Sequence, residues 1–141
     1  MRIEKHLEAL REVLDCISSA LEDRKGLVFH QRRLMAMLSL GVPQLIEIYL
    51  HKKGAIGADA NIKHEWFSLS GRNLKAKFES ILTKNVEKLD GLLVLARKIE
   101  DGRNEIVYGA PLGDGRILRE KIDLFLELKE TVEREAGVKI A

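Results

Sequence analysis

The chain has 141 residues and nearly balanced charge, with 24 Lys and Arg against 22 Asp and Glu and a formal net charge of +2. This balance argues against a strongly basic nucleic-acid coat and against an acidic tail. A hydrophobic share of 45% excludes wholesale disorder, and a single cysteine excludes an internal disulfide framework. We expect one cytoplasmic domain over residues 1–141, with no membrane-crossing segment, because no apolar run approaches the length of a bilayer span.

Two long amphipathic helices are predicted in the first part of the chain. Leucines and isoleucines spaced by three and four residues indicate a first helix over about residues 2–24. A second helix spans about 27–52, where Pro43 must kink it or split it in two. The apolar pattern continues across the proline, which favours one kinked helix. Residues 53–63 hold two glycines and no periodic pattern, so we expect a loop there.

Three further helices are expected in the second part. The predicted elements are a helix over about 71–84, a longer helix from Val86 to Val107, a loop over 109–115 and a last helix over about 116–136. Within the longer helix, Asp101 and Gly102 either continue the helix or form a turn. No stretch alternates as a strand would. The predicted fold class is therefore all-α, an up-and-down helical bundle of four to five helices.

Arg103 is the most informative single residue. A continuous helix would place it on or beside the buried stripe, seven residues after Ala96 and four after Ile99. A charge there is costly unless it is paired. Two interpretations stay open. Arg103 either binds an anion such as phosphate in a cleft, or its methylene groups pack against the core while its guanidinium reaches solvent or Glu100.

The segment Arg103–Gly109, with the sequence RNEIVYG, resembles the signature of the HEPN family of helical-bundle proteins. That signature is an Arg followed, after four to six residues, by a His, late in a long helix and before a final helix. The resemblance implies a HEPN-like cleft in which Arg103 holds phosphate, Asn104 orients it, and Tyr108 donates a hydrogen bond or stacks on a base. It also implies RNA or nucleotide as ligand, a homodimer that joins two motifs, and a nucleotidyltransferase partner in a toxin–antitoxin pair.

The motif departs from the family at Tyr108, which stands where the His is expected. A tyrosine hydroxyl ordinarily titrates near about pH 10 and is a poor general base at neutral pH. Whether the protein is an enzyme therefore stays open, with Arg103 and Tyr108 as the candidate catalytic pair of a weak or inactive metal-independent ribonuclease. Residues five apart on a regular helix also point about 140° apart. The two side chains meet only if the helix unwinds near Gly109 or a partner supplies the second copy.

A second basic cluster, Arg32 and Arg33, lies in the segment HQRR near the start of the second predicted helix. These arginines are either phosphate contacts on the rim of a cleft or part of a solvated helix surface. The alternative function is a non-catalytic helical module for protein–protein interaction, with Arg103 in a structural ion pair.

The remaining candidate ligands are isolated. His6, His51 and His64 have no partner at metal-ligand spacing, and Cys16 stands alone. We therefore expect no metal site and no cofactor, with these histidines at the surface or in loops.

Overall fold

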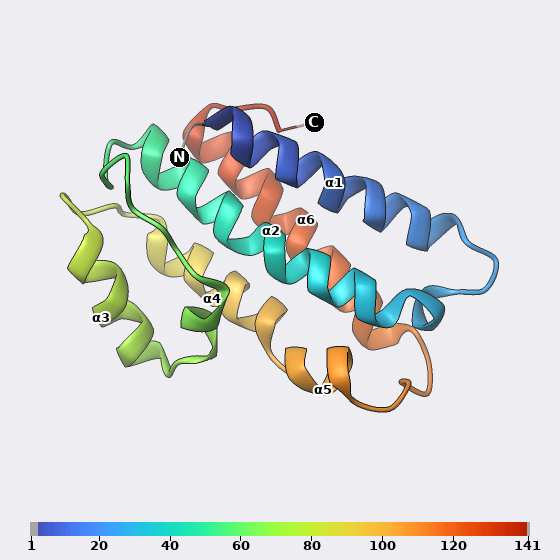
Figure 1. The fold of residues 1–141 in the computed structure, drawn as a ribbon. Coiled ribbons are helices and arrows are strands. Elements are labelled where there is room, and N and C mark those ends of the chain that lie inside the picture. The colour runs from blue at the N-terminus through green and yellow to red at the C-terminus, as the bar shows by residue number, and fades with distance from the viewer. Residues whose placement is uncertain (1–2, 141) are drawn as a thin grey trace.

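The computed structural model describes residues 3–140, and these contain helices and loops without a strand, which confirms the predicted all-α bundle (Figure 1). The α-helices are α1 (Ile3–Glu22), α2 (Gln31–Lys52), α3 (Gly71–Ile81), α4 (Leu89–Glu100), α5 (Arg103–Tyr108) and α6 (Arg116–Ala136). Two short 3-10 helices, η1 (Leu27–His30) and η2 (His64–Ser68), precede α2 and α3. The long helices α1, α2, α4 and α6 alternate in direction along the bundle (Figure 1).

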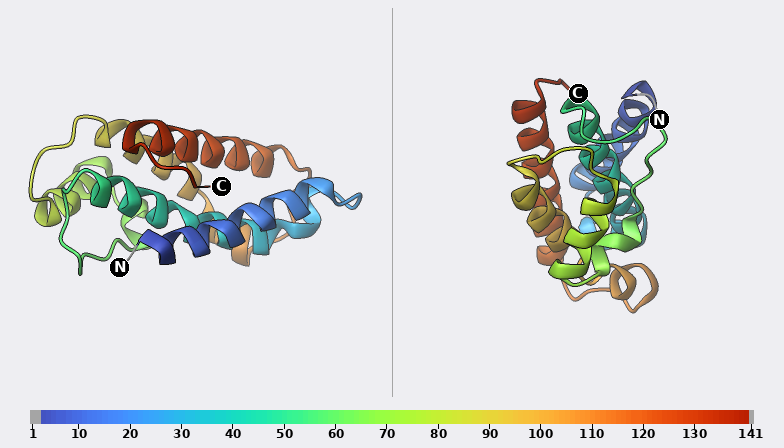
Figure 2. Two further views of the ribbon diagram at one scale, coloured as in Figure 1. Left: turned by 90° about the horizontal axis from the view of Figure 1, so that it is seen from above. Right: turned by 90° about the vertical axis from the view of Figure 1, so that its left-hand side faces the viewer.

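Helix α2 lies between α1 and α6 and forms the centre of the core (Figure 2). Its leucines on the buried side, including Leu34 and Leu38, are fully inaccessible to solvent. Gly41 permits the close approach of α6, because a Cβ at this position would lie 2.7 Å from the ring of Phe125. Helix α2 continues through Pro43, which confirms one helix rather than two.

The segment Leu27–Lys52 corrects one expectation from the sequence. It is long and apolar enough to cross a membrane by length and composition alone, with a mean hydropathy of 1.3 in its most apolar window. In the structure, 72% of that window is buried inside the protein. Such burial is typical of the core helix of a bundle, because the neighbouring helices cover the apolar side chains in place of lipid.

The ends of two predicted helices differ from the structure. The first helix ends at Glu22 rather than at residue 24, and its expected start at residue 2 lies outside the described residues. Helix α3 ends at Ile81 instead of residue 84. There the backbone N–H of Thr83 donates to the carbonyl of Ala55 at 2.8 Å. This bond ties the chain to the 53–63 loop and prevents another helical turn.

The predicted helix from Val86 to Val107 is wrong, and the alternative turn at Asp101 and Gly102 is correct. Helix α4 begins at Leu89 and ends at Glu100, and α5 starts at Arg103. Gly102 has φ 74°, a left-handed conformation that glycine adopts without steric cost.

Lys121 of α6 stabilises this break. Its Nζ donates to the carbonyls of Lys98 at 2.6 Å and Asp101 at 2.5 Å. The end of a helix leaves carbonyls without a helical partner, and the buried ammonium supplies one. The break gives Arg103 a direction that a continuous helix would not allow.

Candidate functional site

A pocket of about 560 Å³ opens beside the turn between α4 and α5. The residues that line it include Arg97, Lys98, Glu100, Arg103 and Asn104. Two of the predicted site residues, Arg103 and Asn104, therefore lie in one pocket. Helix α4 contributes the first three residues and α5 the last two, so the pocket depends on the helix break.

Arg103 is half-buried and fixed by hydrogen bonds. Its Nε donates to the Oγ of Ser39 on α2 at 2.9 Å, and its Nη1 donates to the Oδ1 of Asn104 at 3.2 Å. Within residues 3–140, its guanidinium forms no ion pair with a carboxylate. The protein thus orients Arg103 through neutral groups, and the positive charge stays available to a ligand.

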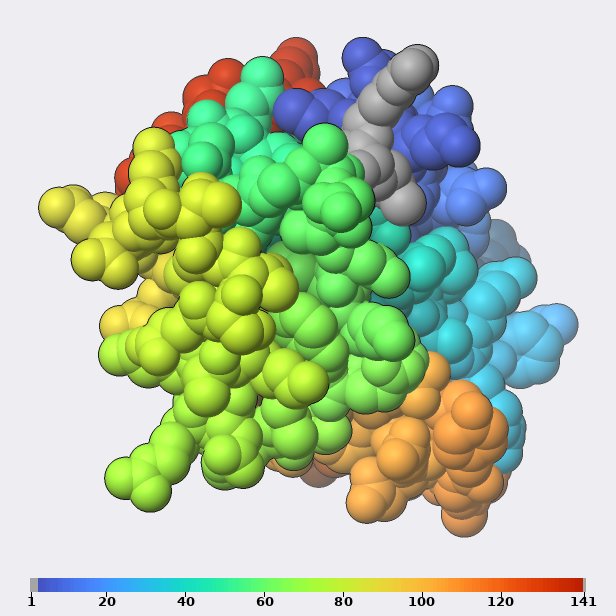
Figure 3. Space-filling model, turned by 60° about the vertical axis from the view of Figure 1, so that its left-hand side comes forward, coloured from blue at the N-terminus to red at the C-terminus, as the bar shows by residue number. Residues whose placement is uncertain are grey.

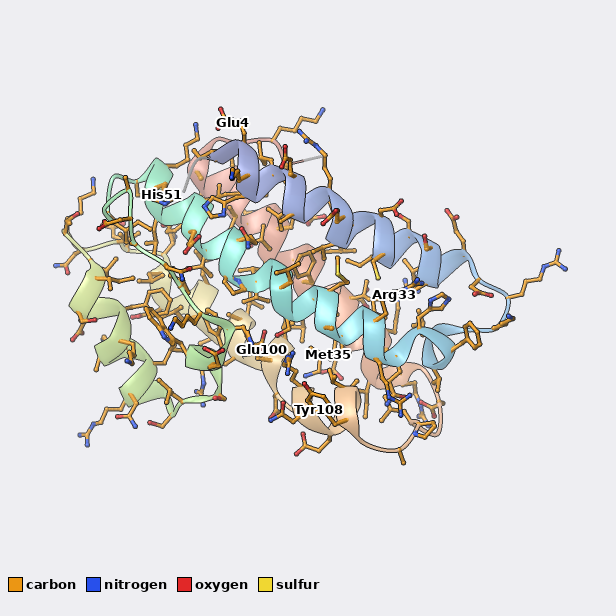
Figure 4. The ribbon with its side chains drawn as sticks, viewed as in Figure 1. Glu4, Arg33, Met35, His51, Glu100 and Tyr108 are labelled. Atoms are coloured by element: carbon orange, nitrogen blue, oxygen red, sulfur yellow. The ribbon has the colours of Figure 1, made fainter. Side chains whose placement is uncertain are left out.

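Glu100 lies where α4 meets α2 and is only 8% exposed (Figure 4). Burial raises its pKa from 4.5 to about 7, because the carboxylate loses its hydration. The hydrogen bond with Ser39 and the charges of Arg103 and Lys121 act in the opposite direction and are the weaker effects. The Oε1 atom of Glu100 has no hydrogen-bond partner in the described part of the chain.

The segment that leads into the pocket is basic. Residues 63–98 contain eight Lys and Arg and four Asp and Glu, a formal charge of +4 in a chain of +2, so the remainder sums to −2. Helices α3 and α5 share one face of the molecule (Figure 3). The pocket itself is mixed in charge, since Asp101 and Glu105 line it beside the basic residues.

Tyr108 lies outside this pocket. Its side chain is 76% exposed at the far end of α5. Arg32 reaches the same end of α5, where its Nη2 donates to the carbonyl of Gly109 at 2.9 Å. The structure therefore places Arg32 near Tyr108, and both apart from Arg103 and Asn104. The expected common cleft of Arg103 and Tyr108 is not formed within one chain, because α5 stays helical between them.

Arg33 points away from α5. In Figure 4, Arg33 and Tyr108 lie on opposite sides of α2. An Nη2 of Arg33 donates to the Nδ1 of His30 at 2.8 Å, and the Nε2 of His30 lies 2.8 Å from Asp23. The guanidinium also reaches Cys16, whose thiol pKa is raised by burial against the opposing influence of Arg33. Arg32 and Arg33 both line a second, open pocket of about 360 Å³ over η1 and the start of α2, but their guanidinium groups hydrogen-bond to different partners.

Gln31 is a residue that the sequence did not single out. It is 2% exposed, and its Nε2 donates to the carbonyls of Ile106 at 2.9 Å and Ala110 at 3.2 Å. Its Oε1 accepts the N–H of Leu112 at 2.8 Å. One amide therefore holds the end of α5 and the loop after it against α2.

The sequence analysis also did not identify Ser39 and Lys121, although the sequence around each residue indicates an unusual position. Ser39 interrupts the apolar run of α2, and Lys121 stands directly before Ile122 on the buried stripe of α6. A polar residue on an apolar stripe needs a partner. Here both partners belong to the α4–α5 turn.

His6 corrects the expectation that the histidines lie at the surface. It is completely buried, contacts the Oε1 of Gln44 through Nδ1, and places Nε2 3.2 Å from the Oε2 of Glu47. The other oxygen of Glu47 accepts the N–H of Ile62 at 2.6 Å. Among the described residues, no three His, Cys, Asp or Glu side chains gather as a metal site would require.

Comparisons of the chain with protein-family models, curated proteins and solved structures give no match. The fold and the site define an all-α bundle with a pocket at a broken helix.

Proposed function

We propose that the protein binds phosphate groups of RNA or of a nucleotide in the α4–α5 pocket. The observation that carries the proposal is the guanidinium of Arg103, which lines an open pocket and is held by Ser39 and Asn104 without a carboxylate partner in the described chain. A guanidinium has five N–H donors in a planar fork that matches phosphate oxygens. The two bonds to Ser39 and Asn104 leave three of these donors for a ligand.

The surroundings of Arg103 support an anionic ligand. Arg97 and Lys98 line the same pocket, where Asp101 and Glu105 oppose them, and the preceding segment, residues 63–98, has a formal charge of +4. A positive region attracts a polyanion over several ångströms and raises its rate of association. The raised pKa of Glu100 also reduces the negative charge of the pocket near neutral pH.

The resemblance to HEPN proteins extends the proposal to a cytoplasmic homodimer of a toxin–antitoxin system, with a nucleotidyltransferase as partner protein. The exposed Tyr108 and the neighbouring Arg32 are supporting features, since they leave one end of α5 accessible to a second copy. In such a dimer, Tyr108 contacts a nucleotide held by Arg103 of the other copy. Cleavage of RNA is weak or absent, because position 108 lacks a histidine.

The test is the affinity of the purified protein for a fluorescent 12-nucleotide single-stranded RNA, measured by anisotropy in EDTA. We expect Arg103→Ala to weaken binding at least tenfold, which corresponds to the loss of one charged hydrogen-bonding partner. The matched control is Arg119→Ala on α6, an exposed arginine that lies 3.4 Å from Asp123 and outside the pocket. This variant should bind RNA as the native protein does.

A thermal unfolding curve for each variant separates the two function classes. If Arg103→Ala lowers the melting temperature strongly and leaves RNA affinity unchanged, Arg103 is structural and the protein–protein interaction module is the better assignment. A Tyr108→His variant tests the catalytic part. Cleavage in EDTA by this variant alone indicates a HEPN-like site without its base.

A further inference from the structure

Glu100 has an unsatisfied oxygen in the wall of the same pocket. Its side chain is 8% exposed, and Oε1 has no hydrogen-bond partner in the described part of the chain. A buried polar atom in this state costs about 1–3 kcal/mol, and native proteins rarely keep one without a reason. Glu100 lines the pocket while Oε1 itself is covered, so a donor on a ligand can become its partner when the carboxyl group turns toward the opening.

The groups around Glu100 come from four elements. Ser39 of α2 forms its hydrogen bond, and the charges of Arg103 on α5, Lys121 on α6 and Glu65 on η2 act on it. The Nζ of Lys121 is occupied by two backbone carbonyls. The Nε of Arg103 is occupied by Ser39. Neither cation donates to Glu100, so its free oxygen faces no donor from these side chains.

The position of Glu100 relative to Arg103 specifies the donor. Both side chains contact the same Ser39 hydroxyl, which accepts from Arg103 at 2.9 Å and hydrogen-bonds to Glu100. A phosphate held by Arg103 and a donor held by Glu100 therefore belong to neighbouring atoms of one ligand. In RNA, the ribose 2′-hydroxyl lies beside the 3′-phosphate and donates a hydrogen bond, and DNA lacks this group.

We propose that Glu100 recognises the ribose 2′-hydroxyl beside the phosphate on Arg103, so that the pocket selects RNA over DNA. This inference rests on the proposed function, and it adds the substrate class and the residue that discriminates it. A carboxylate accepts a hydrogen bond from the hydroxyl group, and a protonated carboxyl group still accepts one through its carbonyl oxygen.

The experiment compares three 12-nucleotide single strands of one sequence: RNA, DNA with uracil in place of thymine, and 2′-O-methyl RNA. Binding is measured by anisotropy at pH 7 in EDTA. The native protein should bind RNA roughly fivefold more tightly than DNA, the effect of about one net hydrogen bond. The 2′-O-methyl strand has no 2′ proton to donate, so it should bind as weakly as DNA.

Two substitutions and one control locate the effect. Glu100→Leu should reduce RNA affinity to within about twofold of the DNA affinity of the same variant, because the hydrogen bond to the 2′-hydroxyl is lost. Glu100→Gln retains an oxygen acceptor and should keep an intermediate preference for RNA, which also serves if the leucine variant folds poorly. Glu130→Gln removes an exposed carboxylate on α6, outside the pocket, and should keep the native preference.

Three results overturn the inference. Equal binding of RNA and DNA by the native protein, with Arg103→Ala weakening both, rejects the role of Glu100 and leaves the phosphate site intact. A preference for RNA that persists in Glu100→Leu, or tight binding of the 2′-O-methyl strand, also rejects it. If neither RNA nor DNA binds, the proposed function fails and this inference fails with it.

Discussion

Two buried carboxyl groups, Glu47 and Glu100, contact opposite parts of the bundle and differ in how their oxygens are satisfied. Glu47 is 3% exposed and Glu100 is 8% exposed, so their burial is similar. The oxygens of Glu47 face the N–H of Ile62 and the ring of His6. One oxygen of Glu100 has no partner in the described chain, and its residue lines a pocket.

This difference fits a structural role for Glu47 and the binding role that we propose for Glu100. Glu47 joins α2 to α1 and to the 53–63 loop within a sealed cluster, since His6 is completely buried. Glu100 lies at the α4–α5 turn, where a ligand can reach the pocket. Burial of a charged group alone therefore does not identify a functional site. An unsatisfied buried atom alone does not identify one either, because His6 Nε2 and the neighbouring His51 Nε2 also lack a hydrogen-bond partner in the described chain. The open pocket beside Glu100 is the feature that distinguishes it.

The largest effect is expected at the sealed cluster. Glu47→Leu removes the partner of Ile62 and of His6, and should lower the free energy of unfolding by about 4 kcal/mol, as for a broken buried pair. Urea denaturation followed by circular dichroism measures this change. Glu12→Leu, at an exposed position of α1, should change stability by less than about 0.5 kcal/mol. A loss below about 1 kcal/mol for Glu47→Leu contradicts the structural role.

The next effect concerns the pH dependence of stability at Glu100. The folded protein keeps the Glu100 proton up to about pH 7, whereas the unfolded chain releases it near pH 4.5. The folded state binds more protons between these values, so the contribution of Glu100 to stability is complete below pH 4.5 and is lost as pH rises to 7. The total loss is about 3 kcal/mol.

Glu100→Gln does not titrate and tests this prediction directly. The free energy of unfolding should be measured for the variant and for the native protein at each pH. The difference, variant minus native, should increase by about 3 kcal/mol between pH 4.5 and pH 8. Urea unfolding at several pH values gives the difference. Parallel stability curves for Glu100→Gln and the native protein would show that Glu100 titrates normally.

The smallest effect is expected at Ser39, which connects Arg103 with Glu100. Ser39→Ala removes one hydroxyl and should lower stability by about 1 kcal/mol, because Arg103 can turn toward solvent. RNA affinity should decrease about threefold to tenfold, since the guanidinium is no longer held in place. Ser18→Ala, at an exposed position of α1, is the matched control and should affect neither quantity. Unchanged RNA affinity in Ser39→Ala argues against a positioning role.

The sequence predicts the helices far better than it predicts the pocket. The stripes of α1, α2 and α6 follow from local periodicity, and Gly137 ends α6 as expected, in the left-handed conformation. The break at Gly102 was harder to predict, because glycine inside a helix costs only about 1 kcal/mol. The break is stabilised by the hydrogen bond from Lys121 to the carbonyl of Asp101, and these residues are 20 positions apart along the chain.

The pocket depends on contacts that periodicity does not contain. Arg103 and Ser39 are 64 residues apart, and their hydrogen bond forms only because α5 restarts in a new direction beside α2. The motif names Arg103 and Asn104, which are adjacent in sequence, and both line the α4–α5 pocket. The motif also grouped Tyr108 with these two residues. In the structure, Tyr108 lies outside the pocket, because α5 is helical between Arg103 and Tyr108. His6 was misplaced because its partners, Gln44 and Glu47, lie on another helix.

The contact between Gly41 and Phe125 restricts how related sequences can vary. The ring of Phe125 is fully buried, and two of its carbons lie within 2.8 Å of the position that a Cβ at residue 41 would occupy. Alanine at position 41 therefore requires a smaller side chain at position 125 or a wider spacing of α2 and α6. Positions 41 and 125 are expected to covary among homologues, and this pair offers a criterion for recognising distant relatives of the fold.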